Sequence, residues 1–252
     1  MKQDKAYKLL AIQEGISNSA AKELIDLGLV MHGGKRLEIA RGLMPVNTIF
    51  KLAKPELSVL FEDENLLAIN KPIGIASEHI KNNYTLLNRL DKDTSGIVLF
   101  AKNEEFLKAA KNEYKKERVQ KLYLAITNKI VSEGMEIDEP ILTIKGKSAF
   151  SKISNSENAK YAYTRLEPLI IEGKKTLLKV QIATGRTHQI RVHLNSVGLG
   201  ILGDVKYSKI ISSRLMLHCA RTKIFDYDIK TPMPNDFHKD FDLKGINLDF
   251  LF

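Results

Sequence analysis

One break in the sequence pattern constrains the fold of this 252-residue chain more than any other feature. Within Lys51-Leu-Ala-Lys-Pro55-Glu56 the apolar periodicity lapses and a proline interrupts the chain, which is typical of a linker. The linker predicts two domains, residues 1–53 and residues 54–252. Because the first is too small to enclose an enzyme site, we expect it to be a binding module and the second domain to carry the chemistry.

The first segment has the pattern of two helices followed by short strands. Polar side chains at 17–19 offer an N-cap for a helix over residues 20–27, and Gly28 stands where a helix commonly ends. A Gly-Gly pair at 33–34 then predicts a tight turn between two strands. This pattern favours a small, compact α/β domain.

The second segment opens with a hairpin signal, in which two apolar runs flank Asp63-Glu-Asn65. Beyond it, helical and strand patterns interleave without a regular βαβ rhythm, which favours a mixed α+β domain over a doubly wound one. The expected strands cover residues 57–61, 66–70, 97–101, 122–127, 162–166 and 176–182, and the expected helices cover residues 104–117 and 189–197.

Composition excludes several classes of protein. Hydrophobic residues make up 44%, enough for a buried core, and no apolar run approaches the roughly 20 residues of a membrane-spanning helix. No signal-peptide pattern opens the chain, and the lone Cys219 rules out an internal disulfide or a cysteine-cluster metal site. We therefore expect a soluble, cytoplasmic monomer. Its net charge of +9 agrees with a polyanionic partner, but only weakly.

The first candidate chemical cluster is Asn88-Arg-Leu-Asp-Lys-Asp-Thr-Ser-Gly96, directly before an expected buried strand. Arg89 and Lys92 flank Asp91 and favour its ionised form, which suits a nucleophile or a base acting on a sugar or base carbon. The alternative is a plain polar turn, because Asp, Thr, Ser and Gly are also common turn residues.

The second cluster is Thr184-Gly-Arg-Thr-His-Gln-Ile-Arg-Val-His193. A helix that begins near Thr187 would place His188 and Arg191 on one face. Arg186 and Arg191 could bind phosphates or pair with a carboxylate. The two histidines are five residues apart, which is not the spacing of a helical zinc pair, so we expect no metal. The alternative is an exposed, basic start of a helix.

The third cluster is Lys121-Leu-Tyr123 at the start of an expected strand. A tyrosine in this position could stack on a nucleic-acid base. Taken alone, a tyrosine in such a position is more often part of the core or of its rim.

Taken in order, the three clusters resemble the signature motifs of RluA-type RNA pseudouridine synthases. Shorter matches at 71–74, 201–204 and 217–218 fall in the same order, so the resemblance covers nearly the whole second segment. The first segment resembles the S-four RNA-binding domain. The resemblance implies an α+β catalytic domain built on a mixed, mainly antiparallel sheet with flanking helices, preceded by the small RNA-binding domain.

By this resemblance Asp91 is the catalytic aspartate of a reaction that detaches the uracil of a uridine in RNA, turns it and rejoins it to the ribose through carbon 5. Asp91 could attack the sugar or the base, or remove a ribose proton, and the sequence does not choose among these. The resemblance also implies that Arg191 pairs with Asp91, that Tyr123 stacks on the target base, and that Arg89 fills the gap left by the flipped nucleotide. The reaction involves no redox change, so we expect no cofactor.

The resemblance implies RNA as the partner, with large-subunit ribosomal RNA favoured over transfer RNA by analogy. One departure from the family pattern is Asn88, where a histidine is usual; asparagine can form hydrogen bonds but cannot titrate, and we expect activity to survive. The candidate RNA-binding residues, of which Arg186 and Lys71 could equally be structural, are Arg89, Arg186, Lys71, Lys22, Lys35 and Arg36.

Two other functions stay open at this point. A non-catalytic RNA-binding or ribosome-assembly factor could be built on the same fold, although the complete set of Asp91, Tyr123 and Arg191 argues against it. A glycoside hydrolase would need two carboxylates, and Asp91 and Asp93 are the nearest pair.

Overall fold

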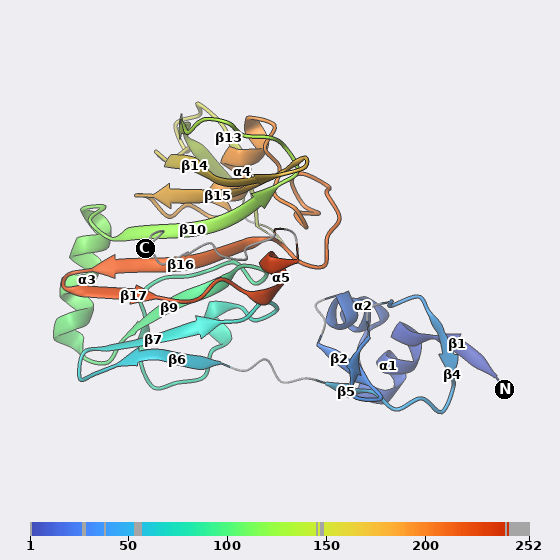
Figure 1. Cartoon of the computed structure of the whole chain (residues 1–252). Coiled ribbons are helices and arrows are strands. Elements are labelled where there is room, and N and C mark those ends of the chain that lie inside the picture. Colours follow the sequence, from blue (N-terminus) through green and yellow to red (C-terminus); the bar gives the residue numbers. More distant parts are fainter. Residues whose placement is uncertain are drawn as a thin grey trace. The chain divides into compact units, whose positions relative to one another are not determined.

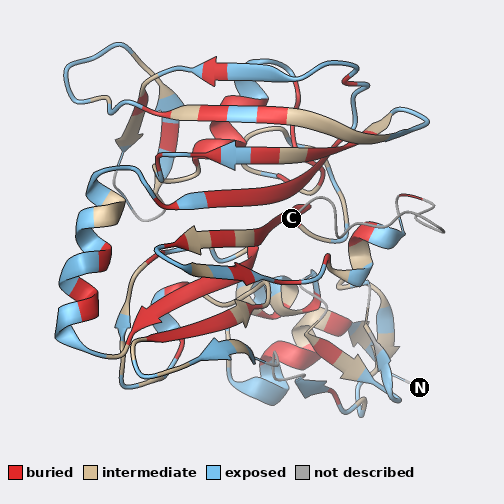
Figure 2. Cartoon of the chain, turned by 60° about the vertical axis from the view of Figure 1, so that its left-hand side comes forward, coloured by how far each residue is buried: buried red, intermediate tan, exposed pale blue. Residues whose placement is uncertain are grey.

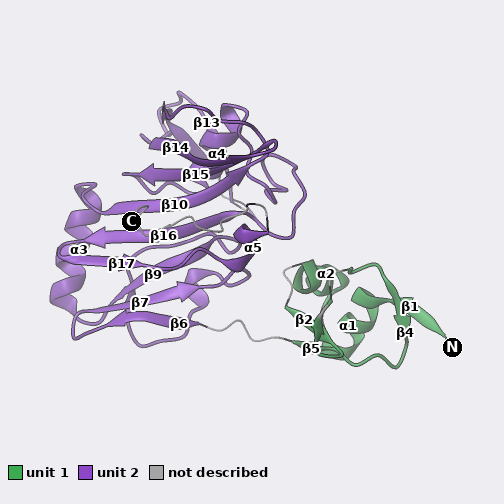
Figure 3. Cartoon of the chain, in the orientation of Figure 1, with its two compact units in different colours: residues 1–56 green, residues 57–252 purple. Residues whose placement is uncertain are grey.

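The computed structural model describes residues 2–26, 29–37, 39–52, 57–144, 146, 149–239 and 241 (Figure 1). The chain forms two compact units, residues 1–56 and residues 57–252 (Figure 3). The last four residues of the expected linker, 53–56, lie outside the described residues. The first two are not linker, because Lys51–Leu52 forms strand β5 and pairs with Val30 and Met31.

The first unit packs two helices against two small sheets around the buried side chains of Leu10, Ile25 and Phe50. The expected cap is present, since the Ala20 N–H donates to Ser17 Oγ over 3.1 Å, while Gly28 lies outside the described residues. The elements of this unit are β1 (Gln3–Lys5), α1 (Ala6–Glu14), α2 (Asn18–Asp26), β2 (Val30–His32), β3 (Lys35–Arg36), β4 (Leu43–Pro45) and β5 (Lys51–Leu52).

The second unit is built on one large sheet with the strand order β11-β14-β15-β10-β16-β9-β7-β6, to which β17 and β8 add at β16 and β9. Among the described strand pairs of this sheet, only β16 with β9 is parallel, so the expected mixed, mainly antiparallel α+β fold is confirmed. The strands are β6 (Ser58–Glu62), β7 (Leu66–Lys71), β8 (Thr85–Leu86), β9 (Ser95–Ala101), β10 (Gln120–Thr127), β11 (Met135–Asp138), β14 (Tyr163–Glu172), β15 (Lys175–Ile182), β16 (Leu217–Ile224) and β17 (Tyr227–Lys230).

Helices and a separate hairpin complete this unit. Helix α3 (Glu104–Lys115) begins at Asn103, whose side chain accepts a hydrogen bond from the Phe106 N–H (2.8 Å), and it packs its apolar face on the sheet. The remaining elements are η1 (Ser77–His79), the hairpin β12 (Ile141–Ile144) with β13 (Phe150–Ile153), α4 (Gln189–Ser196) and α5 (Asn235–His238). No helix in the described part of the chain is long and apolar enough to cross a membrane.

The core of the second unit lies along its central strands, as the red segments of Figure 2 show. Every residue of β9 is buried, which agrees with the apolar run over residues 97–101. Gly96 allows β9 to run beside β16, because a Cβ at this position would lie 2.2 Å from the Cys219 carbonyl oxygen. Its φ of +115° is also one that side chains rarely adopt. This close approach fixes the loop before β9 against the sheet.

Candidate active site

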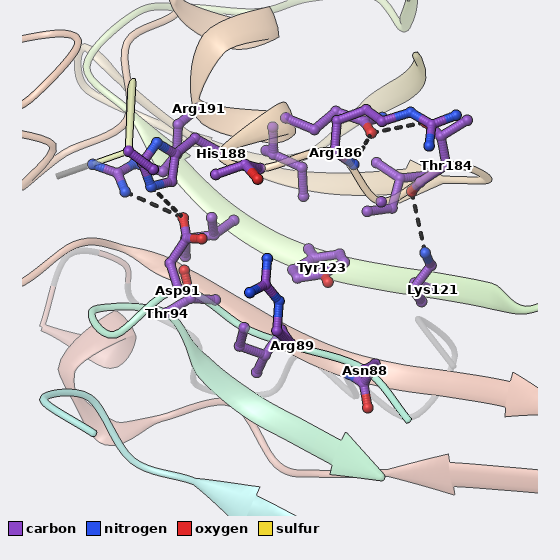
Figure 4. Close-up of a pocket in the computed structure, with 18 of the residues that line it drawn as sticks. Asn88, Arg89, Asp91, Thr94, Lys121, Tyr123, Thr184, Arg186, His188 and Arg191 are labelled. Atoms are coloured by element: carbon purple, nitrogen blue, oxygen red, sulfur yellow. Dashed lines mark hydrogen bonds and ion pairs between the residues drawn. The ribbon is translucent and has the colours of Figure 1, made fainter. Parts of the chain in front are cut away.

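The three sequence clusters meet at one cavity of ≈ 730 Å³ in the second unit (Figure 4). The loop before β9 lines one side, β10 the floor, and the start of α4 the other side. Segments that are about 100 residues apart in the sequence therefore face one another across it. The expected site residues at its walls are Asp91, Tyr123, Arg191, Arg89 and Arg186.

Asp91 projects its carboxylate from the loop between β8 and β9. The Thr94 N–H donates to the Asp91 carbonyl oxygen over 3.0 Å and closes a turn. The polar turn that the sequence also allowed is therefore present, and it carries the aspartate. Asp91 Oδ2 lies 3.2 Å from Arg191 Nη1 and 3.8 Å from His188 Nε2. The side chain is 25% exposed, so a substrate in the cavity can reach it.

Arg191 is buried on α4 between two aspartates. Its Nε and Nη2 donate to Asp204 Oδ2 and Oδ1, both over 2.8 Å, and its Nη1 donates to Asp91. Burial alone would lower the pKa of Arg191, but the hydrogen bonds and charge of Asp204 outweigh it and raise that pKa. The bidentate pair fixes the plane of the guanidinium and with it the nitrogen that faces Asp91.

Asp204 is a site residue to which the sequence assigned no role. Its side chain is fully buried, and burial would raise its pKa, yet the bonds from Arg191 and from backbone N–H groups hold that pKa below its usual value. Gly203 precedes it with φ +77°, and a Cβ there would meet the Arg214 carbonyl oxygen at 1.7 Å. In the sequence, the only indication of this residue was the pair Gly203-Asp204, which follows the second cluster.

Tyr123 lies in the floor of the cavity on β10 and is 6% exposed. Burial raises the pKa of its hydroxyl well above the usual value, so the phenol is neutral. The two readings of this tyrosine are compatible, because it is both a core residue and part of the cavity wall. Its ring is available to a planar group that enters the cavity.

Arg89 and Arg186 are the more accessible cations of the cavity. The Arg89 side chain is 66% exposed and pairs with Glu78 at 3.0 Å. Arg186 donates through Nε to the Tyr161 carbonyl (2.7 Å) and lies 3.8 Å from Glu117. Both guanidinium groups can therefore meet a ligand that spans the rim.

Lys71 has the contacts of a structural residue, the second of its two sequence interpretations, and its burial argues against a direct contact with RNA. It is completely buried, and its Nζ donates to the carbonyl oxygens of Pro72 (2.9 Å), Ile75 (2.8 Å) and Lys92 (3.2 Å). Burial lowers its pKa to about 7. Since Lys92 follows Asp91 directly, Lys71 anchors the loop that carries the aspartate, which is its structural role.

Asn88 also has a structural role. Its Nδ2 donates to the Ile97 carbonyl (3.1 Å) and its Oδ1 accepts from the Leu99 N–H (2.7 Å). The amide thus binds the edge of β9 as a neighbouring strand would. An asparagine can make both bonds at once without titrating, so the departure from the family pattern does not disturb Asp91.

Helix α4 begins at Gln189, where the expected helix over residues 189–197 also begins, and not near Thr187. His188 occupies the N-cap position with a left-handed φ of +56°. This conformation, uncommon for a residue other than glycine, brings the imidazole to Asp91 even though the helix has not yet begun. The expected proximity of His188 and Arg191 is therefore correct, but it arises from the cap and not from a shared helical face.

The chain is similar to known proteins in both sequence and structure. A model of the RNA pseudouridylate synthase family matches residues 62–196. An uncharacterized RNA pseudouridine synthase of Helicobacter pylori (strain ATCC 700392 / 26695) is 48% identical over 241 residues, which is 93% of this chain and 99% of the relative. The chain belongs to the RNA pseudouridylate synthase family. It is therefore an isomerase that converts uridine in RNA to pseudouridine, and the hydrolase and non-catalytic alternatives are not favoured.

Other pseudouridine synthases agree. Ribosomal large subunit pseudouridine synthase C of Rickettsia conorii is 34% identical over 211 residues (71% of this chain, 69% of the relative). The tRNA pseudouridine synthase C of Haemophilus ducreyi is 32% identical over 202 residues (65% of this chain, 83% of the relative). The structure of human RNA pseudouridylate synthase domain containing 1 is similar with a TM-score of 0.62 and 25% identity, covering 71% of this chain and 84% of that one.

Lys121, which the third sequence cluster contains but to which the sequence assigned no role, also lines the pseudouridine synthase cavity. It is 7% exposed, and its Nζ donates to the Thr184 carbonyl (3.1 Å), which ties β10 to the segment before α4. Burial lowers its pKa to about 8. In the sequence, the indication that Lys121 belongs to the cavity was its position two residues before Tyr123.

Two of the candidate RNA-binding residues of the first unit, Lys22 and Lys35, lie on its surface or near it. Lys35 is exposed on β3, and Lys22 Nζ lies 4.3 Å from the centre of the Tyr7 ring. The side chain of Arg36 lies outside what the structure describes. Within the described ranges, no three histidine, cysteine or acidic side chains gather as a metal site would require.

Proposed function

We propose that Asp91 is the catalytic group of this pseudouridine synthase and that its substrate is a uridine in large-subunit ribosomal RNA. One observation carries the assignment: the Asp91 carboxylate faces the cavity and is held by Arg191, which is itself fixed by the buried Asp204. A carboxylate so oriented is suited to act at one atom of a bound nucleotide.

The reaction breaks the bond between N1 of uracil and C1′ of ribose and forms a bond between C5 and C1′. C5 then loses its proton and N1 gains one, so the atoms balance without any added reagent. Asp91 contributes either by attacking the sugar or the base, or by taking a ribose proton. Each route requires an ionised carboxylate at a fixed position, which the Arg191–Asp204 pair provides.

Tyr123 and Arg89 have complementary proposed roles in base flipping. The ring of Tyr123, in the floor of the cavity, stacks on the uracil after it leaves the RNA helix. Arg89, exposed at the rim, occupies the space that the base vacates and offsets part of the flipping cost of roughly a few kcal/mol. Arg186 contacts a backbone phosphate of the same RNA.

The first unit is proposed to be an S-four-like RNA-binding domain, with residues 1–53 as the domain and 54–252 as the catalytic part. Lys22, Lys35 and Arg36 supply its phosphate contacts. Ribosomal RNA is favoured because such a module suits a large structured RNA and because the Rickettsia relative is a ribosomal large subunit pseudouridine synthase. The Haemophilus relative keeps transfer RNA as the second candidate.

The test is tritium release from RNA that is labelled with [5-³H]uridine and extracted from cells lacking this protein. We expect the wild-type protein to release tritium as C5 exchanges its hydrogen for the new bond, and Asp91→Asn to release none while still binding RNA. The matched control is Asp93→Asn, two residues away in the same loop, which we expect to stay active. Activity in Asp91→Asn, or loss in Asp93→Asn alone, would contradict the assignment.

A further inference from the structure

The ring of His188 lies between Asp91 and Tyr207. Its Nδ1 is 2.6 Å from the Tyr207 hydroxyl, and its Nε2 is 3.8 Å from Asp91 Oδ2. The side chain is only 11% exposed, and the left-handed φ of +56° brings it there at a conformational cost. A strained backbone next to the proposed catalytic carboxylate indicates that the position of this ring has a function.

The direction of the hydrogen bonds can be worked out from the partners of Tyr207. Its hydroxyl oxygen already accepts from the Ser151 N–H (3.0 Å), and its own proton has Nδ1 of His188 as an acceptor. If Nδ1 carried the proton instead, the lone pair of Nε2 would face the negative Asp91 carboxylate. The arrangement that avoids this repulsion has the hydroxyl donating to Nδ1 and the ring proton on Nε2.

We propose that His188 is a positioning residue for Asp91, held by Tyr207 as the neutral tautomer that directs its Nε2–H at the carboxylate. This proposal rests on Asp91 being the catalytic group. It assigns a role to Tyr207, a residue outside the three sequence clusters.

The ring of His188 is neutral mainly because it is buried. Burial is the main cause of its lowered pKa, and Arg191 and Lys206 lower that pKa further, whereas Asp91 and Asp204 act in the opposite direction. A neutral imidazole can direct its N–H at the carboxylate without placing a second full positive charge beside Arg191.

The two groups that hold Asp91 approach the same oxygen. Among the described residues, the side-chain contacts of the carboxylate with Arg191 and His188 both involve Oδ2. The other oxygen, Oδ1, is then the one directed at the substrate. Two donors on one oxygen restrict rotation of the carboxylate more than either donor alone.

Tyr207 is itself held firmly enough to serve as the anchor. Its ring stacks on Phe150 of β13, with centroids 5.3 Å apart and planes inclined by 25°. Its N–H donates to Asp204 Oδ1 (3.1 Å), and the Arg191 guanidinium lies 5.1 Å from its ring centre. The same buried Asp204 therefore holds both Arg191, which contacts Asp91, and Tyr207, which acts on Asp91 through His188.

The tautomer can be measured in the free, full-length protein by long-range ¹H–¹⁵N spectroscopy of labelled histidines. We expect an unprotonated Nδ1 and a protonated Nε2 for His188 at pH 7, with the signal assigned by its loss in His188→Gln. In Tyr207→Phe the Nδ1–H form should become populated. A ring protonated on Nδ1, or on both nitrogens, in the wild-type protein would overturn the proposal.

A second experiment measures single-turnover tritium release from [5-³H]uridine-labelled RNA together with RNA affinity. We expect His188→Ala and Tyr207→Phe to slow release about tenfold, with unchanged RNA affinity, because the first removes the imidazole that faces Asp91 and the second removes the hydrogen bond that orients this imidazole. His188→Gln, whose amide can still donate, should recover part of the rate, and the exposed His238→Gln is the control.

A wild-type rate in His188→Ala would overturn the positioning role, as would a loss confined to RNA affinity. If the wild-type protein itself releases no tritium, the proposed function fails, and that result is distinct because the tautomer measurement does not depend on activity.

Discussion

The two units use positive charge in opposite ways. In the first unit the candidate RNA-binding lysine Lys35 is exposed to solvent. In the second, Lys71, Lys121 and Arg191 are buried and hydrogen-bonded to carbonyls or carboxylates. The exposed cations can attract and contact a polyanion, whereas the buried ones hold the segments around Asp91. The net charge of the chain does not distinguish these two uses.

The difference has an energetic basis. A buried charge loses its hydration and is tolerated only when partners replace it, so removal of one partner leaves an uncompensated charge. An exposed charge keeps its water, and its ion pairs contribute about 0–1 kcal/mol. Predictions about the two kinds of cation should therefore differ strongly in size.

The largest expected effect is that of Asp204→Asn. It leaves Arg191 buried with Asp91 as its remaining carboxylate, so we expect the free energy of unfolding to fall by about 3–5 kcal/mol and tritium release to fall with it. The comparison variant is Asp228→Asn, which breaks the more accessible pair with Arg221 (2.6 Å) and should cost at most about 1 kcal/mol. Equal losses in denaturant unfolding would break the distinction between buried and exposed pairs.

The next effect is a pH dependence that Lys71 confers on stability. The folded pKa of about 7 lies below the unfolded value of 10.5, so between these values the unfolded chain binds more protons and stability rises with pH. We expect the unfolding free energy of the wild type minus that of Lys71→Met to increase by about 1.4 kcal/mol per pH unit above pH 7. A difference that does not change with pH would show that Lys71 keeps its proton when buried.

The smallest effect is expected for the exposed lysines of the first unit. The double variant Lys22→Ala with Lys35→Ala should weaken RNA binding only several-fold, and reduce the slope of log affinity against log salt by about 1.4–1.8. Lys108→Ala with Lys111→Ala, exposed on α3, is the control and should leave the slope unchanged. The same slope in both double variants would remove the first unit from RNA binding.

The sequence predicted local structure well because local structure follows local pattern. The hairpin of β6 and β7, the buried β9 and the cap at Ser17 are all confirmed, since turn residues, apolar runs and cap side chains act over a few positions. The proximity of Asp91 and Arg191 could also be expected, but only because the motifs resemble a known family. Periodicity alone does not join segments about 100 residues apart.

What the sequence could not supply depends on tertiary contacts. Lys71 has the same side chain as an RNA-binding lysine, and its role is decided by the carbonyl oxygens that surround it. Asp204 becomes essential only because the chain returns beside Arg191 after α4. The left-handed backbone of His188 likewise follows from packing and not from the preference of histidine.

The most direct test of the account is a map of pseudouridines in ribosomal and transfer RNA from a strain lacking this protein, complemented with either the wild type or Asp91→Asn. We expect at least one pseudouridine in large-subunit ribosomal RNA to vanish in the deletion strain, to return with the wild type, and to stay absent with Asp91→Asn. Its return with Asp91→Asn, or an unchanged map in the deletion strain, would contradict the claim that Asp91 isomerises a uridine in RNA.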